Sequence, residues 1–77
     1  MLRKRDNPQE EKLRTYLRNQ RKKMGLSQVE LSEMCGLPQS FVSKYETGER
    51  YLTFIEVLMI CKVLKINILD LSKEVES

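Results

Sequence analysis

The sequence holds few of the side chains that enzymes and metal sites require. Histidine is absent, and the two cysteines, Cys35 and Cys61, lie 26 residues apart. Zinc-finger ligand spacings and Cys–His or Ser–His nucleophile pairs are therefore excluded, and we expect no catalytic residue, no metal ligand and no cofactor. Both cysteines fall on apolar helix faces and are predicted to be reduced core residues. This inventory favours a binding module over an enzyme.

Length and composition are those of one small globular domain. The chain has 77 residues, of which 32% are charged and 40% are hydrophobic. The longest apolar run, Val57 to Cys61, is five residues long, and the N-terminus carries no apolar leader. Neither a membrane span nor a signal peptide is expected, so we predict a cytoplasmic protein with no membrane partner.

Positive charge is concentrated at the N-terminal end. Residues 1–23 contain nine Lys or Arg against three Asp or Glu, a net +6. Residues 24–50 contain two against four, and residues 51–77 contain three against four, so both are slightly negative. A basic stripe favours a polyanionic partner, with nucleic acid as the first candidate. A solvated basic tail would explain the charge alone equally well.

Capping and terminating residues divide the first two thirds of the chain into three helices. Asn7-Pro8 opens the first helix, and Gly25 ends it. A Ser-x-x-Glu capping box at Ser27 opens the second, which Gly36 stops after about two turns. The third is predicted over residues 38–46. Two short helices joined by a turn that contains glycine are typical of a helix-turn-helix.

Two further helices complete a predicted all-α, compact five-helix bundle. Thr53 and Glu56 repeat the capping-box spacing before a helix that is apolar almost all round and must be buried on several sides. Asn67 can cap a last short helix. The expected organisation is a flexible basic segment at residues 1–8, a helix-turn-helix domain at residues 9–73 and a frayed C-terminus at residues 74–77.

A longer motif runs through these helices. It reads Arg21-x-x-Met24-Gly25-Leu26-Ser27-Gln28-x-Glu30-Leu31-Ser32, then Gly36, Ser43 and Glu46-x-Gly48-x-Arg50. In order and spacing, the stretch from residue 17 to residue 71 resembles the Cro/cI-type helix-turn-helix domains of phage repressors and xenobiotic-response-element regulators. The resemblance implies a lambda-repressor-like bundle whose third helix enters the DNA major groove. It also implies a DNA-binding transcriptional regulator of the repressor or controller type.

The third predicted helix has side chains suited to reading bases. Its apolar residues point inward, which leaves a polar face of hydrogen-bonding types with suitable reach for base edges. An ordinary polar surface is the alternative interpretation of this face. The residues that we expect to read bases are Gln39, Ser40, Ser43 and Lys44.

The resemblance also implies contacts to DNA phosphates. Gln28 opens the second helix, and Arg50 follows the third; both match positions that hold the DNA backbone in similar proteins. Arg18, Lys22 and Lys23 are expected to add phosphate contacts, although a solvated face explains these three nearly as well.

Further positions matter for the framework rather than for DNA contact. Arg21 and Glu46 match positions that pair in related repressors, so we expect a structural ion pair. Ser32 stands where the family usually has Ala, and its hydroxyl there needs a partner or water. Lys65 stands where Gly commonly closes the fourth helix, and a positive φ there is costly. Pro38 replaces a common Ser or Thr cap at the entrance of the third helix.

A surplus of apolar residues on the last two helices favours a two-fold homodimer, although one small core could equally hold them. Together with the resemblance, this predicts a homodimer bound to a palindromic operator in double-stranded DNA. The expected dimer interface contains Ile66, Ile68 and Leu69. Two other classes of function remain open. An antitoxin-like protein would hold a partner protein, a toxin or another regulator, through its C-terminal helices, with DNA binding secondary. A pure protein-interaction module would keep the fold without binding DNA.

Overall fold

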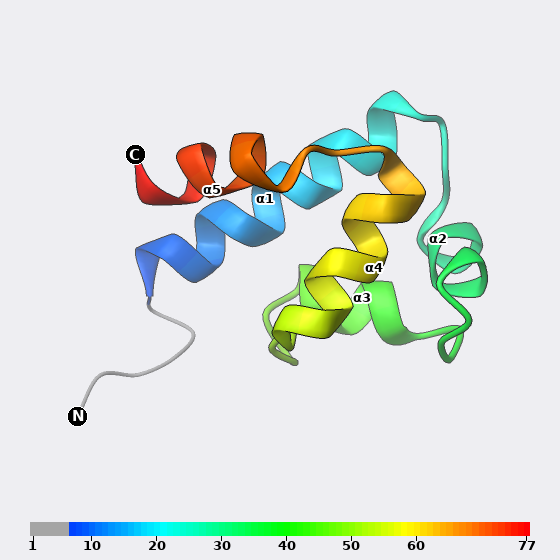
Figure 1. Ribbon diagram of the computed structural model, residues 1–77. Helices are drawn as coiled ribbons and strands as arrows, with labels where there is room; N and C mark the ends of the chain where they lie inside the picture. Colours follow the sequence, from blue (N-terminus) through cyan, green and yellow to red (C-terminus); the bar gives the residue numbers. More distant parts are fainter. Residues whose placement is uncertain (1–6) are drawn as a thin grey trace.

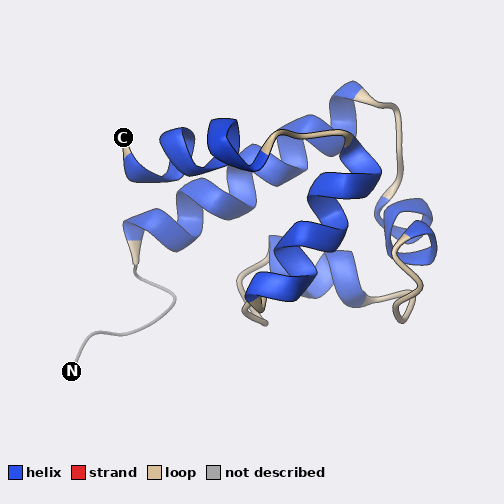
Figure 2. Cartoon of the chain, in the orientation of Figure 1, coloured by secondary structure: helices blue, strands red, loops and turns tan. Residues whose placement is uncertain are grey.

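The computed structural model describes residues 7–77, and over this range the chain forms five α-helices and no strand (Figure 2). Helix α5 lies alongside α1, while α2 and α3 pack together at the other end of the domain, next to α4 (Figure 1). The predicted all-α five-helix bundle is confirmed. The helices are α1 (Pro8–Lys23), α2 (Gln28–Met34), α3 (Phe41–Glu46), α4 (Phe54–Leu64) and α5 (Ile68–Glu76).

Local capping contacts fix the start of four of these helices. Ser27 Oγ accepts from the Glu30 amide at 3.0 Å, and the Ser27 amide donates to Glu30 Oε1 at 2.8 Å. Thr53 and Glu56 repeat this capping box at 3.1 and 2.9 Å. The asparagines that precede α1 and α5 accept bonds from first-turn amides. Asn7 and Pro8 thus belong to α1, and the remainder of the basic segment predicted at residues 1–8 lies outside the described residues.

Helix α3 begins three residues later than the sequence predicts. Residues 38–40 form a turn, in which the Phe41 amide donates to Pro38 O at 2.9 Å. Ser40 occupies the N-cap position, but its side chain makes no capping bond. The fixed φ of Pro38 suits a tight turn as well as a first helical turn, which explains the error. Gln39 and Ser40 therefore precede α3 instead of lying on it.

The core contains apolar side chains from all five helices. Both cysteines belong to it, and both are free thiols, as the sequence predicts. Burial raises the pKa of both thiols and keeps them neutral. No helix within residues 7–77 combines the length and apolarity needed to cross a bilayer. The buried apolar residues are Leu17, Leu31, Cys35, Phe41, Val42, Tyr45, Val57, Ile60, Cys61, Leu64 and Leu71.

Helix α4 is less buried than its composition predicts. Ile60 and Leu64 are in the core, but the side chains of Phe54 and Ile55, in the first turn, are 69% and 63% exposed. Phe54 lines an apolar groove of about 280 Å³ that α4 shares with α1 and α5. The prediction of burial on several sides is therefore wrong for the first turn of this helix.

A left-handed residue closes α4 and directs the chain into α5. Lys65 has φ 58° and ψ 42°, and it is the one non-glycine residue with positive φ among residues 7–77. The Ile66 amide donates to Cys61 O at 2.8 Å and completes the corner. Helix α5 then continues to Glu76, through residues that were expected to fray, and Val75 packs against the core.

Candidate nucleic-acid interface

The two faces of α3 differ sharply in burial. Phe41, Val42 and Tyr45 are buried, and the rings of Phe41 and Tyr45 meet edge to face with centroids 5.3 Å apart. On the other side, Lys44 is exposed and Ser43 is half-buried. Gln39 and Ser40 are exposed in the turn just before the helix. The structure thus brings the four predicted base-reading residues onto one short, continuous segment.

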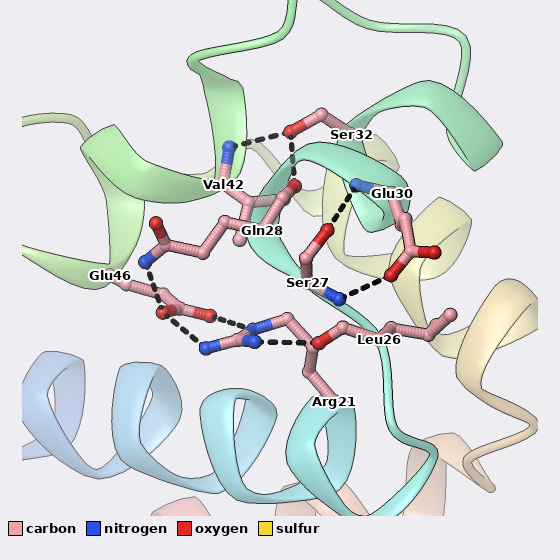
Figure 3. A network of polar contacts seen from close by, with 8 residues as sticks. All are labelled: Arg21, Leu26, Ser27, Gln28, Glu30, Ser32, Val42 and Glu46. Atoms are coloured by element: carbon pink, nitrogen blue, oxygen red, sulfur yellow. Dashed lines mark hydrogen bonds and ion pairs between the residues drawn. The ribbon is translucent and has the colours of Figure 1, made fainter.

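A buried ion pair fixes the C-terminal end of α3. Arg21 Nε donates to Glu46 Oε2 at 2.8 Å and Arg21 Nη2 donates to Glu46 Oε1 at 3.1 Å, with both side chains almost fully buried (Figure 3). A third donor, Arg21 Nη1, bonds Leu26 O at 2.7 Å. The predicted pair is present, and one guanidinium joins the end of α1, the following loop and the end of α3.

Gln28 is part of the same network. Its Nε2 donates to Glu46 Oε1 at 2.9 Å, and it comes from the first turn of α2 (Figure 3). A carboxamide nitrogen carries two N–H groups, so one can serve Glu46 while the other donates to a phosphate. Structural support and the predicted phosphate contact are therefore compatible at this residue.

Ser32 links α2 to α3 at the other end of α3. Its side chain is completely buried. The Ser32 hydroxyl donates to Gln28 O at 2.9 Å within α2 and accepts from the Val42 amide of α3 at 3.1 Å (Figure 3). The hydroxyl that the sequence left in need of a partner therefore has two.

Arg50 has a stronger structural role than the sequence suggests. Its guanidinium forms two bonds to the Glu56 carboxylate, at 2.7 and 2.6 Å, and a third to Tyr51 O at 2.9 Å. It also lies over the Phe41 ring, 5.1 Å from the centroid. The bond from Arg50 is the main reason that the pKa of Glu56 falls to about 2. The Glu56 carboxylate compensates the charge of Arg50. The main role of the Arg50 side chain in this structure is therefore to hold the α3–α4 loop.

The predicted phosphate-binding residues of α1 are exposed, but they do not all lie near α3. Arg18 lines a polar hollow of about 220 Å³ together with Glu46 and Thr47, at the end of α3. Lys22 and Lys23 belong to the last turn of α1 and do not line this hollow. The structure therefore places Arg18 closer to the end of α3 than the two lysines.

Arg14 is a residue of this region that sequence reasoning missed. Its guanidinium covers Gly48, so closely that a Cβ placed on Gly48 would lie 3.3 Å from Arg14 Cζ. Arg14 also lines the polar hollow beside Arg18. The spacing of Arg14, Arg18 and Arg21, four and then three residues apart, puts them on one helix face and could have identified it.

The predicted dimer residues are only partly accessible. Leu69 is 67% exposed, whereas Ile66 and Ile68 are half-buried against the core. Ile68 also lines the apolar groove, whose opposite wall contains Phe54. Phe54 and Ile55 were not predicted as interface residues, although the capping box at Thr53 places both in an exposed first turn.

Comparison with known proteins identifies the family. A helix-turn-helix family model matches residues 17–71, which is most of the chain. The chain belongs to the Cro/cI-type helix-turn-helix family. Members of this family bind DNA and regulate transcription, and the chain is accordingly a DNA-binding transcriptional regulator and not an enzyme.

A solved structure shows the same fold. The clp gene regulator ClgR from Corynebacterium glutamicum superposes with a TM-score of 0.80 at 22% sequence identity. The match covers 92% of this chain and 76% of that one. No curated protein sequence matches this Cro/cI-type chain at a significant level.

Proposed function

We propose that this Cro/cI-type protein is a cytoplasmic homodimer that recognises a palindromic operator in double-stranded DNA and represses or controls transcription there. Two copies of α3 would enter successive major grooves about 34 Å apart. The observation that carries the proposal is the division of α3 into a buried apolar face and an exposed polar segment, held at both ends by bonds from α2 and, at Glu46, from α1.

In this proposal the exposed segment reads bases, and the residues around it hold phosphates. Gln39, Ser40, Ser43 and Lys44 supply donors and acceptors for base edges. Gln28, Arg50, Arg18, Lys22 and Lys23 supply the phosphate contacts, which set position and make the affinity depend on salt.

Selection from a pool of random duplexes tests operator recognition. We expect a two-fold symmetric consensus, bound at least about a thousand times more tightly than random DNA. Weak binding that is blind to sequence would refute the proposal. Affinity for the selected duplex, measured against salt concentration, then counts the phosphate contacts.

Arg50 needs a matched control because it also holds a loop. Arg50→Ala should weaken binding to any duplex and reduce the salt slope by about one unit if the guanidinium contacts phosphate. Glu56→Gln disturbs the same loop and leaves Arg50 in place, so it should keep the wild-type slope. Equal slopes in wild type and Arg50→Ala would leave this residue with its structural role alone.

The homodimer is supported by apolar side chains that the single chain leaves exposed. Leu69, Phe54 and Ile55 are each more than 60% exposed, and Phe54 also lines the groove between α4 and α5. Sedimentation of the wild type should show a dimer that Leu69→Lys converts to a monomer. Met34→Lys changes a side chain that is 55% exposed on α2 and should leave the dimer intact. A wild type that is monomeric at all concentrations would remove the dimer from the proposal.

The same apolar surface supports a second candidate function. The groove has an almost wholly apolar lining and could receive a partner protein, as an antitoxin-like protein would require. In that case the wild type is monomeric, and Leu69→Lys abolishes binding of the partner while DNA binding changes little. Sedimentation without DNA therefore separates the two candidates.

A further inference from the structure

The buried hydroxyl of Ser32 is the one polar side-chain contact between α2 and the start of α3 among the described residues. It accepts from the Val42 amide at 3.1 Å and donates to Gln28 O at 2.9 Å. The bond to the Val42 amide is buried, so water cannot replace it when the hydroxyl is lost. The position of the first turn of α3 is thereby tied to that of the first turn of α2 (Figure 3).

Helix α3 depends on this outside contact more than an ordinary helix would. It has six residues, too few to be stable by itself. The first amides of any helix need acceptors from elsewhere, and these usually come from the N-cap side chain. Ser40 stands at the N-cap but makes no such bond. Ser32 supplies the missing acceptor from a neighbouring helix.

The other end of α3 is held independently. Glu46 accepts from Arg21 and from Gln28, so α2 contacts α3 through Ser32 at its start and through Gln28 at its end. Loss of the contact at Glu46 would release the end of α3, whereas loss of Ser32 would release its start. The start carries Gln39 and Ser40, which are exposed directly before Phe41.

We propose that Ser32 is a positioning residue for base recognition, which sets the orientation of the start of α3 through its bond to the Val42 amide. This inference rests on the proposed operator recognition. Contacts to base edges tolerate errors of only about 0.5 Å, whereas contacts to phosphates are less demanding. Loss of the hydroxyl should therefore reduce affinity for the operator much more than affinity for random DNA.

The test compares the full-length Ser32→Ala variant with wild type on the selected operator and on a random duplex of equal length. We expect operator affinity to fall about tenfold, as for a weakened contact to one base, while affinity for random DNA changes less than about twofold. Ile60→Val is the matched control, since it weakens the core in α4 without removing a polar contact. It should leave the ratio of the two affinities at the wild-type value.

The outcomes separate this inference from the proposed function. A folded Ser32→Ala protein with an unchanged affinity ratio overturns the positioning role and leaves operator recognition standing. A wild type without preference for any sequence overturns both. If Ser32→Ala does not fold, Ser32→Cys, which is somewhat larger and has a weaker hydrogen-bonding group, is measured in the same way. An intact ratio in that variant also overturns the role.

Exchange of the Val42 amide proton gives a readout without mutation. In wild type, we expect this amide to exchange as slowly as amides of the core, because it donates to a buried acceptor. Exchange as fast as that of an exposed amide would overturn the proposed contact directly.

Discussion

Helices α2 and α3 are joined through buried polar side chains, whereas α4 and α5 meet their neighbours through apolar side chains and leave several of them in solvent. Arg21, Gln28 and Ser32 direct hydrogen bonds at defined atoms of α3. On α4 and α5, Phe54 and Leu69 are more than 60% exposed, and Phe54 lines the apolar groove. Hydrogen bonds are directional and fix one geometry, while apolar contacts tolerate adjustment. The polar half, formed by α2 and α3, is built to hold a short helix in place. The apolar half, formed by α4 and α5, is suited to association with another protein chain.

The largest effect that distinguishes the halves is expected at Glu46. Glu46→Ala leaves the Arg21 guanidinium buried without its carboxylate and should lower the free energy of unfolding by about 3–5 kcal/mol. Leu69→Ala, on the exposed apolar surface, should change it by less than about 0.5 kcal/mol at concentrations at which the protein is monomeric, so that no dimer contact adds to the effect. Urea denaturation of both variants measures the difference. Similar values for the two would contradict the comparison.

A smaller effect is expected in the segment before α3 that we propose to contact DNA. Gln39 is exposed, so Gln39→Ala should leave the stability unchanged. It should weaken binding to the selected operator by about 1–3 kcal/mol and alter the preferred base at one position. Competition with single-base operator variants measures this. If affinity fell equally for every sequence, Gln39 would position the protein and not read a base.

The third effect concerns the ion pair that joins the two halves. The pKa of Glu56 is lowered to about 2, and the largest cause is the hydrogen bond from Arg50. The ionised carboxylate therefore stabilises the folded state. The contribution of this carboxylate to the free energy of unfolding should be complete above about pH 4.5 and should be lost as pH falls toward 2. The Arg50 side chain is 38% exposed, and solvent screening limits the contribution to about 1–2 kcal/mol. Unfolding free energies of wild type and Glu56→Gln should differ at pH 7 and converge near pH 2. A constant difference would contradict this role.

The smallest effect should be a gain in stability at the corner of the apolar half. Lys65 has φ 58°, a conformation that glycine adopts without steric cost. Lys65→Gly should raise the free energy of unfolding by about 0.5–1 kcal/mol, since relief of the strain exceeds the added entropy of the unfolded chain. Lys62→Gly, in the last turn of α4, is the control and should lower it by a similar amount. A loss at both positions would show that Lys65 carries no strain.

The parts of the fold that the sequence predicted well are those coded by neighbouring residues. Ser27 with Glu30 and Thr53 with Glu56 each form a contact within one helical turn, so the pattern and the structure coincide. The family motif extended this to one distant contact, between Arg21 and Glu46. The start of α3 was misplaced because its capping acceptor, Ser32, comes from another helix and leaves no local signal.

The same limit explains what was missed in the candidate site. The exposed character of Gln39 and Lys44 follows from helical periodicity, but the partner of Arg50 does not. Glu56 was assigned to a capping box, and nothing in the sequence shows that its carboxylate also meets a guanidinium. The exposure of Phe54 likewise depends on the groove that α1 and α5 leave beside α4.

Gly48 has a consequence for the tolerance of this protein to mutation. It combines φ 83° with the Arg14 guanidinium directly against its backbone, whereas Gly36, at φ 71°, faces open space. In a library that carries every single substitution, Gly36 should accept Asn and Asp, which enter the left-handed region with least strain. Position 48 should accept them less readily, because the end of the Arg14 side chain must shift by a few tenths of an ångström, and a shorter residue at position 14 should relieve this. Substitutions at Arg14 and Gly48 are thus expected to be coupled, so that a side chain at position 48 is tolerated better when position 14 carries a shorter residue.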